Sequence, residues 1–491
     1  YNHDEGLINA MDKLWNDVVN KKMYITGGIG ARHEGEAFGD AYELPNRTAY
    51  CETCAAIGLV FWAQRMNMLH GDAKYADVVE RAMYNGVLAG IGMNGRSFFY
   101  VNPLESAGNH HRQPFFDCAC CPTNVVRFVP SLPGYQYATD KDGIIVNQFV
   151  AGKATIHLPD GEVTVTMETN YPWDGVCKIN CVPTKKSGST ASKYKIKIRK
   201  PETSQYEVKE AAWDTLFTIN IDMKIETQRI VANPKVVADR GRVAIQRGTI
   251  VYCFEQVDNE VPVLNIKLAR DPQFREEFRK DLIGGVVVIK CLNADGNELT
   301  AIPYYAWDHR EAGAMAVWVR QEGLSKANPI ETADALYTTL KPEMLTNINE
   351  AEPEITASFY SANVNDTPEA IVDGIEPKNS NDHGIPRQTF WNHKGTTEWL
   401  ELDFGKTKRV TRSSIYWFDD TGKGECRVPK SWTLLYKDGG NWKPVKTTAT
   451  FGVEKDKYNT TEFEPIETRA VRVEINLQEK FSGGVLEWKI E

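Results

Sequence analysis

The sequence of 491 residues lacks the features that define several protein classes. No apolar run approaches the roughly 18 residues of a membrane helix, so we expect no membrane span. Basic residues do not predominate: the formal net charge is −9, which predicts no surface for nucleic acid or an anionic membrane. Ten cysteines are too few for a small disulfide-stabilised scaffold. What remains is an ordinary globular composition, with length for about three domains.

Hydrophobic periodicity divides the chain into a helical part and a longer β part. The spacing of apolar residues predicts helices over residues 7–19, 55–69 and 75–88. A long polar loop at residues 24–46 separates the first two, and long ordered loops are usually functional. From residue 137 onward, short alternating patterns with turn residues every 8–12 positions or so favour β-sandwiches.

We therefore predict a multidomain fold that combines a helical unit with all-β units. Residues 1–135 form the helical unit, 136–240 a first β-sandwich, 241–348 a second, and 349–491 a last all-β unit. A polar segment over residues 347–353 is interpreted as the linker before the last unit. Strands are expected at residues 144–149, 153–158, 163–169, 193–199, 216–221, 242–254, 285–291, 399–404, 410–418, 432–437 and 470–475.

Two short cysteine-rich segments are the strongest chemical signal. Residues 51–54 read Cys-Glu-Thr-Cys, and residues 117–122 read Asp-Cys-Ala-Cys-Cys-Pro. Zn²⁺ accepts thiolates and carboxylates in tetrahedral sites, so a zinc site is the leading interpretation. Buried inert thiols are the main alternative. A redox Cys-x-x-Cys pair is less favoured, because no strand-then-helix pattern surrounds Cys51.

The spacing leaves the ligand set open. A set made only of cysteines would use Cys51, Cys54 and two of the three later thiols. The adjacent residues Cys120 and Cys121 are expected to reach one ion only from an irregular backbone. Pro122 favours a non-helical conformation just before it, which supports that expectation.

Glu36 is a candidate acid in the polar loop. It lies two residues before Phe38, and an apolar wall beside the carboxyl would raise its pKa and make it a proton donor. On the residues alone, a solvated loop carboxylate is the simpler interpretation.

Five motifs then occur in order: Met-Tyr-Ile-Thr-Gly-Gly-Ile-Gly from residue 23, Gly-Glu-Ala-Phe from 35, Leu-Pro-Asn from 44, Cys-Glu-Thr-Cys-Ala from 51, and Cys-Cys-Pro-Thr-Asn from 120. With them, residues 1–350 resemble glycoside hydrolase family 127 and its relative family 146, the β-L-arabinofuranosidase-like enzymes. The resemblance implies the C-terminal part of an (α/α)6 catalytic barrel followed by β-sandwiches. It also implies an exo-acting glycosidase that releases L-arabinofuranose or a related furanose from plant glycans.

The resemblance assigns roles to individual residues. Cys120 would be the nucleophile, Glu36 the general acid/base, and Tyr100 a substrate contact. Cys51 and Cys118 would be additional, structural thiols. The implied zinc ligands are Glu52, Cys54, Cys120 and Cys121.

These roles carry two geometric expectations. In retaining enzymes the two catalytic groups lie about 5–5.5 Å apart, so we expect a similar separation between Glu36 and the Cys120 sulfur. Residues two apart on a regular helix point in nearly opposite directions, so Glu52 and Cys54 cannot share an ion from one. The backbone over residues 51–54 is therefore expected to be irregular.

The resemblance covers only the last third of the barrel. We expect the other helices to come from a segment N-terminal to this sequence or from a separate chain, and this piece alone to be inactive without them. The expected partner is an oligosaccharide or polysaccharide substrate. By resemblance only, the location would be periplasmic or extracellular in a bacterium.

The last unit resembles a discoidin-type (coagulation factor 5/8 C-terminal) β-sandwich, through the segments at residues 399–405, 414–418, 428–433 and 471–474. Exposed Trp391 or Trp442 would stack on a sugar in that fold. The resemblance also suggests a Ca²⁺ ion near residues 363–373. A rival interpretation of the whole chain is a non-catalytic carbohydrate-binding or scaffolding protein whose zinc is structural.

Overall fold

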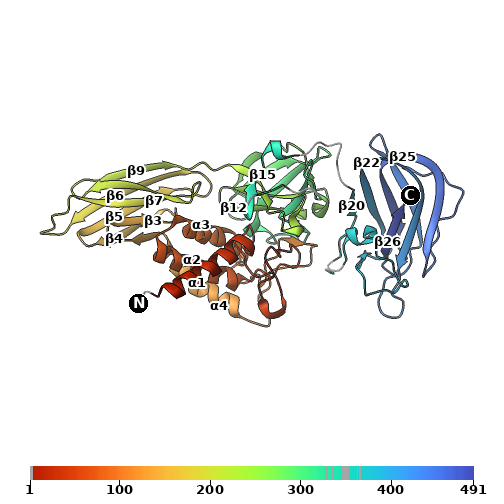
Figure 1. Ribbon diagram of the computed structural model, residues 1–491, viewed down its shortest axis with the longest axis horizontal. Coiled ribbons are helices and arrows are strands. Elements are labelled where there is room, and N and C mark those ends of the chain that lie inside the picture. Colours follow the sequence, from red (N-terminus) through yellow and green to blue (C-terminus); the bar gives the residue numbers. More distant parts are fainter. Residues whose placement is uncertain (1–3, 327–329, 333–334, 346–352, 362, 364–365) are drawn as a thin grey trace.

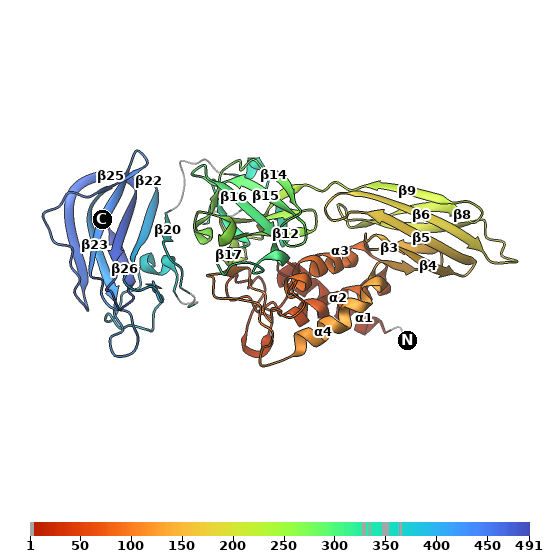
Figure 2. The ribbon, with the colours of Figure 1, turned by 180° about the vertical axis from the view of Figure 1, so that it is seen from behind.

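The computed structural model describes residues 4–326, 330–332, 335–345, 353–361, 363 and 366–491. Three β units lie in a row, and the helices pack beneath the first two of them (Figures 1 and 2). The predicted combination of helices with all-β units is confirmed. In the described ranges, no helix is long and apolar enough to cross a membrane.

The helical unit contains α1 (Glu5–Lys21), α2 (Thr53–His70), α3 (Ala73–Arg81) and α4 (Cys120–Phe128). Periodicity predicted α1 and α2 correctly. The third predicted helix is regular only as far as α3, because a π-helical turn (Ala82–Val87) follows it. This turn brings Asn85 to β12 (Ile250–Glu255), where its side chain accepts a hydrogen bond from the Val251 N–H at 2.8 Å.

The first β unit consists of two four-stranded sheets, in the orders β2-β3-β7-β8 and β4-β5-β6-β9, which share one apolar core. Its strands are β2 (Tyr137–Thr139), β3 (Gly143–Val146), β4 (Gly152–Leu158), β5 (Gly161–Thr169), β6 (Val176–Lys185), β7 (Lys193–Lys200), β8 (Gln205–Ala212) and β9 (Phe217–Asp222). The predicted boundary at residue 240 is wrong. The next strand, β10 (Thr227–Ala232), pairs with β11 (Arg242–Arg247) and β19 (Tyr337–Thr339) of the following unit, which a strand pattern alone does not reveal.

The second β unit is a network of eleven paired strands that includes β1 from the helical unit. The remaining strands are β1 (Glu105–Ser106), β11 (Arg242–Arg247), β12 (Ile250–Glu255), β13 (Lys267–Leu268), β14 (Arg275–Arg279), β15 (Val286–Leu292), β16 (Glu298–Pro303), β17 (Met315–Ala316), β18 (Trp318–Gln321) and β19 (Tyr337–Thr339). Its core contains Trp307 and Trp318 together with Tyr24, Ile25 and Phe99 of the helical unit. This shared core fixes the loops of the helical unit against the second β unit.

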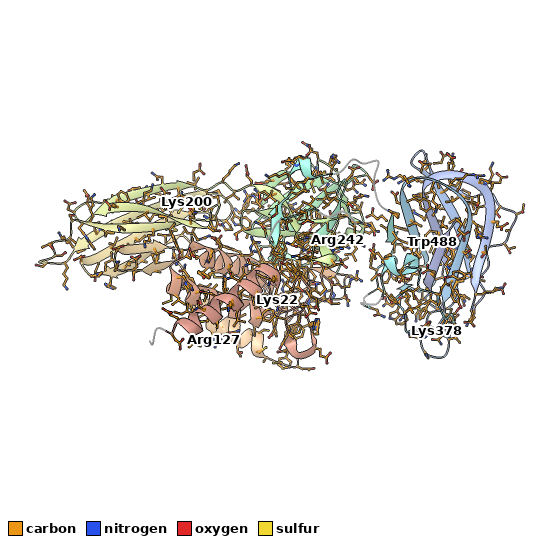
Figure 3. The ribbon with its side chains drawn as sticks, viewed as in Figure 1. Lys22, Arg127, Lys200, Arg242, Lys378 and Trp488 are labelled. Atoms are coloured by element: carbon orange, nitrogen blue, oxygen red, sulfur yellow. The ribbon has the colours of Figure 1, made fainter. Side chains whose placement is uncertain are left out.

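The C-terminal unit is a seven-stranded sheet network around a separate apolar core, in which Trp488 is buried (Figure 3). Its strands are β20 (Glu354–Ala357), β21 (Gln388–Thr389), β22 (Thr397–Phe418), β23 (Ser431–Asp438), β24 (Asn441–Pro444), β25 (Tyr458–Asn476) and β26 (Gly484–Ile490). The strands predicted at 399–404 and 410–418 are one strand, β22, with two shifts in register. Most of the predicted linker, residues 347–352, lies outside the described residues.

Candidate active site

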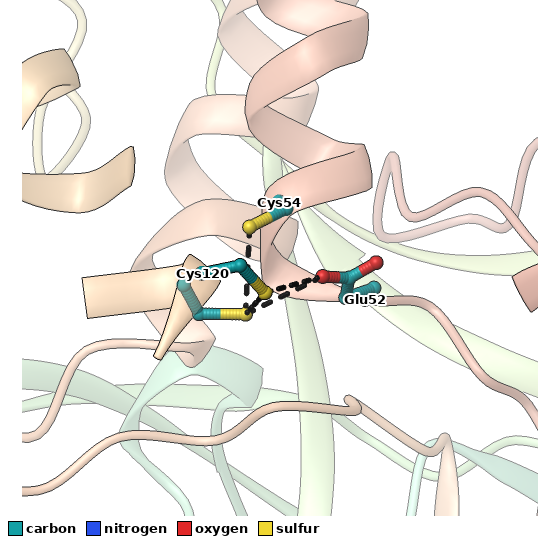
Figure 4. A group of neighbouring side chains, drawn as sticks. Glu52, Cys54 and Cys120 are labelled. Atoms are coloured by element: carbon teal, nitrogen blue, oxygen red, sulfur yellow. Dashed lines mark hydrogen bonds between the residues drawn. The ribbon is translucent and has the colours of Figure 1, made fainter. Parts of the chain in front are cut away.

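The starts of α2 and α4 bring together Glu52, Cys54, Cys120 and Cys121, which we call the Cys–Glu cluster. One ligand atom from each of these side chains lies within 4.8 Å of the other three. The side chains of Glu52, Cys54 and Cys120 point toward a common centre (Figure 4). These are the four ligands that the resemblance implied, now adjacent in space.

The backbone explains how Glu52 and Cys54 reach the same centre. Cys51 is left-handed, with φ 39°, and Glu52 is the extended N-cap of α2, with ψ 139°. The irregularity predicted for residues 51–54 is thus confirmed at its first two positions and wrong at the last two, which are helical. Glu52 precedes the helix and Cys54 lies in its first turn. Their side chains therefore need not point in opposite directions, as those of residues two apart within a regular helix do.

The expectation for the later thiols is wrong. Cys120 and Cys121 are the first two residues of α4, and Pro122 is the third, so the two residues directly before the proline are helical. Proline is tolerated there, because the N–H groups of a first helical turn have no partner within the helix. Adjacent residues at this end both direct their thiols to the cluster.

The spacing within the cluster fits a tetrahedral zinc ion. Sγ of Cys121 lies 3.6 Å from Sγ of Cys54 and 3.7 Å from Sγ of Cys120. With Zn–S bonds of about 2.3 Å, two ligand sulfurs of a tetrahedron are about 3.8 Å apart. A disulfide needs about 2.05 Å between its sulfurs, so these thiols are unbridged.

The electrostatics of the Cys–Glu cluster also suit a cation. Glu52 is 8% exposed and, among the described residues, forms no ion pair; its Oε1 lies 3.2 Å from Sγ of Cys120. Burial raises the pKa of Cys120 to about 12, and the Cys54 thiol together with burial raises the pKa of Cys121. Buried carboxylates and thiolates are normally paired or bound to metal, so this donor set fits zinc.

The candidate acid faces the cluster across one tyrosine hydroxyl. Tyr100 donates a hydrogen bond to Oε1 of Glu36 at 3.3 Å, and Sγ of Cys120 lies 3.2 Å from the same hydroxyl. The distance between Oε1 of Glu36 and Sγ of Cys120 therefore cannot exceed the sum of these two distances. That limit is compatible with the separation of about 5–5.5 Å in retaining glycosidases.

The apolar wall predicted beside Glu36 is absent from its described contacts. The side chain of Glu36 is exposed, and Phe38 is exposed as well, with the Lys22 ammonium 5.9 Å from its ring centre. Instead, Tyr50 donates a hydrogen bond to Oε1 of Glu36 at 2.8 Å, on the same oxygen as Tyr100. The turn that presents the carboxyl is left-handed at Glu36, with φ 49°, a conformation that costs free energy outside glycine.

Asn102 holds the segment that carries these residues. Its side-chain amide donates to the Cys51 carbonyl at 2.8 Å and to Oγ1 of Thr53 at 3.0 Å, and its backbone N–H donates to the Tyr50 carbonyl at 3.2 Å. Asn102 is 2% exposed. Neither Tyr50 nor Asn102 is singled out by the sequence; the only available signals were that Tyr50 precedes Cys51 and that Asn102 follows Tyr100 by two positions.

The remaining sequence candidates fall outside this group. Cys51 is buried in the core shared with the second β unit, in keeping with a structural role, whereas Cys118 is exposed; neither thiol belongs to the Cys–Glu cluster. In the C-terminal unit Trp391 is 43% exposed, as predicted. Trp442 is half-buried, because the Arg472 guanidinium lies 4.4 Å from its ring centre.

A cleft of about 660 Å³ lies between the second β unit and the C-terminal unit, and neither the Cys–Glu cluster nor Glu36, Tyr50 and Tyr100 line it. Arg242, one of its lining residues, is labelled in Figure 3 on the side that faces the C-terminal unit. The Cys–Glu cluster and this cleft are separate features.

Three parts of the chain match known protein families. Residues 1–134 match the family described as "Beta-L-arabinofuranosidase, GH127 catalytic domain", and residues 227–320 match "Glycoside hydrolase family 127 C-terminal domain". Residues 354–486 match "F5/8 type C domain". Separate parts of the chain thus match the catalytic and C-terminal domains of glycoside hydrolase family 127, and the last part matches an F5/8 type C domain.

The chain is also similar to individual proteins of known sequence or structure. The chain is 34% identical over 378 residues to a non-reducing end beta-L-arabinofuranosidase of Bifidobacterium longum subsp. longum, covering 65% of this chain and 56% of the relative. A solved GH127 beta-arabinofuranosidase is 40% identical with a TM-score of 0.60, over 64% of this chain and 56% of that one. A GH127 beta-L-arabinofuranosidase from Geobacillus stearothermophilus T6 is 36% identical with a TM-score of 0.61, over 65% and 57% of the two chains. The chain therefore spans little more than half the length of these relatives.

Proposed function

We propose that this chain carries the catalytic centre of a retaining, exo-acting glycosidase that releases L-arabinofuranose from plant glycans. The observation that carries the proposal is the Tyr100 hydroxyl, which lies within hydrogen-bond distance of both the Glu36 carboxyl and the Cys120 sulfur. A proton donor and a nucleophile at this spacing are what a retaining mechanism requires. Two of the relatives carry the name beta-L-arabinofuranosidase, which supports the choice of sugar.

The chemistry proceeds in two displacements. In the first, the Cys120 thiolate attacks the anomeric carbon, the glycosidic C–O bond breaks, and Glu36 gives its proton to the leaving oxygen. In the second, the Glu36 carboxylate takes a proton from water, the water oxygen bonds to the anomeric carbon, and the C–S bond breaks to restore the thiolate. Zinc held by the Cys–Glu cluster would keep the sulfur deprotonated at neutral pH.

Metal analysis combined with a sugar-release screen tests this proposal. The account predicts one zinc per chain and release of L-arabinose that Glu36→Gln abolishes while the zinc content stays unchanged. Loss of zinc in Glu36→Gln would instead make Glu36 a ligand and require new roles. Bound zinc without any sugar release, from this polypeptide or a longer form that contains it, would favour the rival scaffolding protein with a structural metal.

We also propose that further helices cover the helical unit and complete the sugar pocket. Large apolar side chains are exposed on α1 and on α4 and the turn after it: Leu7, Leu14, Val126, Val129 and Leu132. Soluble proteins rarely leave such a set uncovered. A longer polypeptide that includes these helices is expected to release sugar at least ten times faster than this chain alone; equal rates would contradict the proposal.

For the C-terminal unit we propose a Ca²⁺ site at Glu487 and Asp373, at the end of the region suggested by the sequence. Glu487 is 2% exposed, its Oε2 has no hydrogen-bond partner in the described part of the chain, and burial raises its pKa to about 7. Added Ca²⁺ is expected to raise the melting temperature of the wild type but not of Glu487→Gln. An equal shift in both would contradict the site.

The proposed substrate is a polysaccharide outside the cell, and we propose a periplasmic or extracellular location for that reason. Fractionation of the producing cells tests it, and recovery in the cytoplasm would contradict it.

A further inference from the structure

The strongest unassigned feature of the site is the buried phenol of Tyr50. Tyr50 is 7% exposed, and its ring makes edge contacts with His33, at 4.9 Å between ring centres, and with Tyr100, at 6.2 Å. Its backbone carbonyl is held by Asn102. Tyr50 is therefore fixed from both its backbone and its ring, while Glu36, its partner, lies on an exposed turn.

Tyr50 and Tyr100 both donate a hydrogen bond to the same carboxylate oxygen of Glu36. Tyr50 lies 2.8 Å and Tyr100 lies 3.3 Å from Oε1 of Glu36, and among the described residues no hydrogen bond is found at Oε2. An oxygen that accepts two hydrogen bonds is a poor place for a carboxylic proton. The proton of the neutral acid therefore belongs on Oε2.

The Tyr100 hydroxyl has only one proton to give. It lies between Glu36 and Cys120, so whenever it donates to the sulfur it cannot donate to the carboxylate. The Tyr50 hydroxyl has no such competing sulfur within the described contacts. It is the donor that stays with Glu36 in both displacements.

We propose that Tyr50 is the positioning residue of the general acid: its hydrogen bond to Oε1 directs the proton-bearing Oε2 of Glu36 toward the leaving oxygen. This inference rests on the proposed glycosidase function. It differs from a purely structural role, in which Tyr50 would only support the loop and affect every substrate equally.

The leaving group separates these two roles. The dinitrophenolate of a dinitrophenyl β-L-arabinofuranoside leaves without help from an acid. The alkoxide of an alkyl β-L-arabinofuranoside must be protonated as it leaves. Because hydrogen bonds to charged groups contribute about 1.5–3 kcal/mol, Tyr50→Phe is expected to lower kcat for the alkyl substrate by about 10–100-fold. The rate of dinitrophenolate release in the first displacement, measured before the second displacement limits turnover, should change by less than about 3-fold, since cleavage of this bond draws little on the acid.

Matched variants complete the experiment. Glu36→Gln should show the same preference for the dinitrophenyl substrate in the step that cleaves the glycosidic bond. Tyr24→Phe removes a buried hydroxyl that has no hydrogen-bond partner in the described chain, and should leave both rates near those of the wild type. The positioning role would be overturned if Tyr50→Phe lowered the rate of glycosidic-bond cleavage equally for both substrates, or lowered it for neither.

A second measurement keeps the inference testable if the wild type cleaves neither substrate, which would count against the proposed function alone. Melting temperatures of Tyr50→Phe, Glu36→Gln and the double variant form a cycle. The inference predicts that the double variant loses less than the sum of the single losses. Strictly additive losses would overturn the contact itself.

Discussion

Asn102→Ala is the substitution that tests most sharply how the proposed zinc site is held. The Asn102 amide forms two buried hydrogen bonds to the segment that carries Glu52 and Cys54, one to a backbone carbonyl and one to Thr53. Each is worth about 1 kcal/mol, so the loss is about 2 kcal/mol. If that loss falls on the metal-binding conformation, zinc affinity drops roughly 30-fold, within the 10–100-fold expected for residues behind the ligands.

The assay is competition for zinc between the protein and a chromogenic chelator, with melting temperatures measured alongside. Asn147→Ala is the matched control: Asn147 is also buried and hydrogen-bonded, to Asn67 at 3.1 Å, but in the first β unit. It should lower the melting temperature while leaving the zinc dissociation constant unchanged. A dissociation constant for Asn102→Ala within about 2-fold of the wild type would refute the role given to this residue.

Three further substitutions test buried contacts in the helical unit and at its borders with the first two β units. Arg199→Met, which removes a fully buried guanidinium from two carboxylates of α3, is expected to cost about 3–5 kcal/mol in chemical denaturation, whereas a surface-like cost below about 1 kcal/mol would contradict its burial. Gly28→Ala places a methyl group about 3.0 Å from the Cys51 sulfur and should lower both melting temperature and zinc affinity; wild-type values for both would contradict this contact. Burial raises the pKa of Asp239 from 3.8 to about 7, so its stabilising contribution is complete below pH 4 or so and is lost as the pH rises to about 7. Asp239→Asn should therefore gain stability relative to the wild type between those values, and a difference that does not vary with pH would oppose this assignment.

The sequence was informative where the structure depends on local pattern. Apolar periodicity located α1 and α2, and the two cysteine-rich segments supplied every member of the Cys–Glu cluster. The resemblance then selected Glu52 over Cys51, a choice that spacing had left open. In the structure, the left-handed backbone at Cys51 separates these two neighbours, one into the core and the other into the cluster.

Features that depend on distant partners were not predictable from pattern. The environment of Glu36 was inferred from Phe38, two residues away, yet its partners are tyrosines 14 and 64 positions along the chain. Strand β10 has the pattern of any strand, and only pairing with β11 and β19 assigns it to the second unit. Trp442 is half-buried because the guanidinium of Arg472, from a strand two positions away in the sheet, covers it.

The most direct test of the account is to locate the sugar on the protein. The Glu36→Gln variant, incubated with the dinitrophenyl arabinofuranoside, should accumulate the glycosylated enzyme, because the second displacement lacks its base. Peptide mass spectrometry is predicted to find one pentosyl unit on Cys120, and none in the variant that also carries Cys120→Ser. A pentosyl unit on another residue, or arabinose released by the Cys120→Ser enzyme at the wild-type rate, would contradict the account.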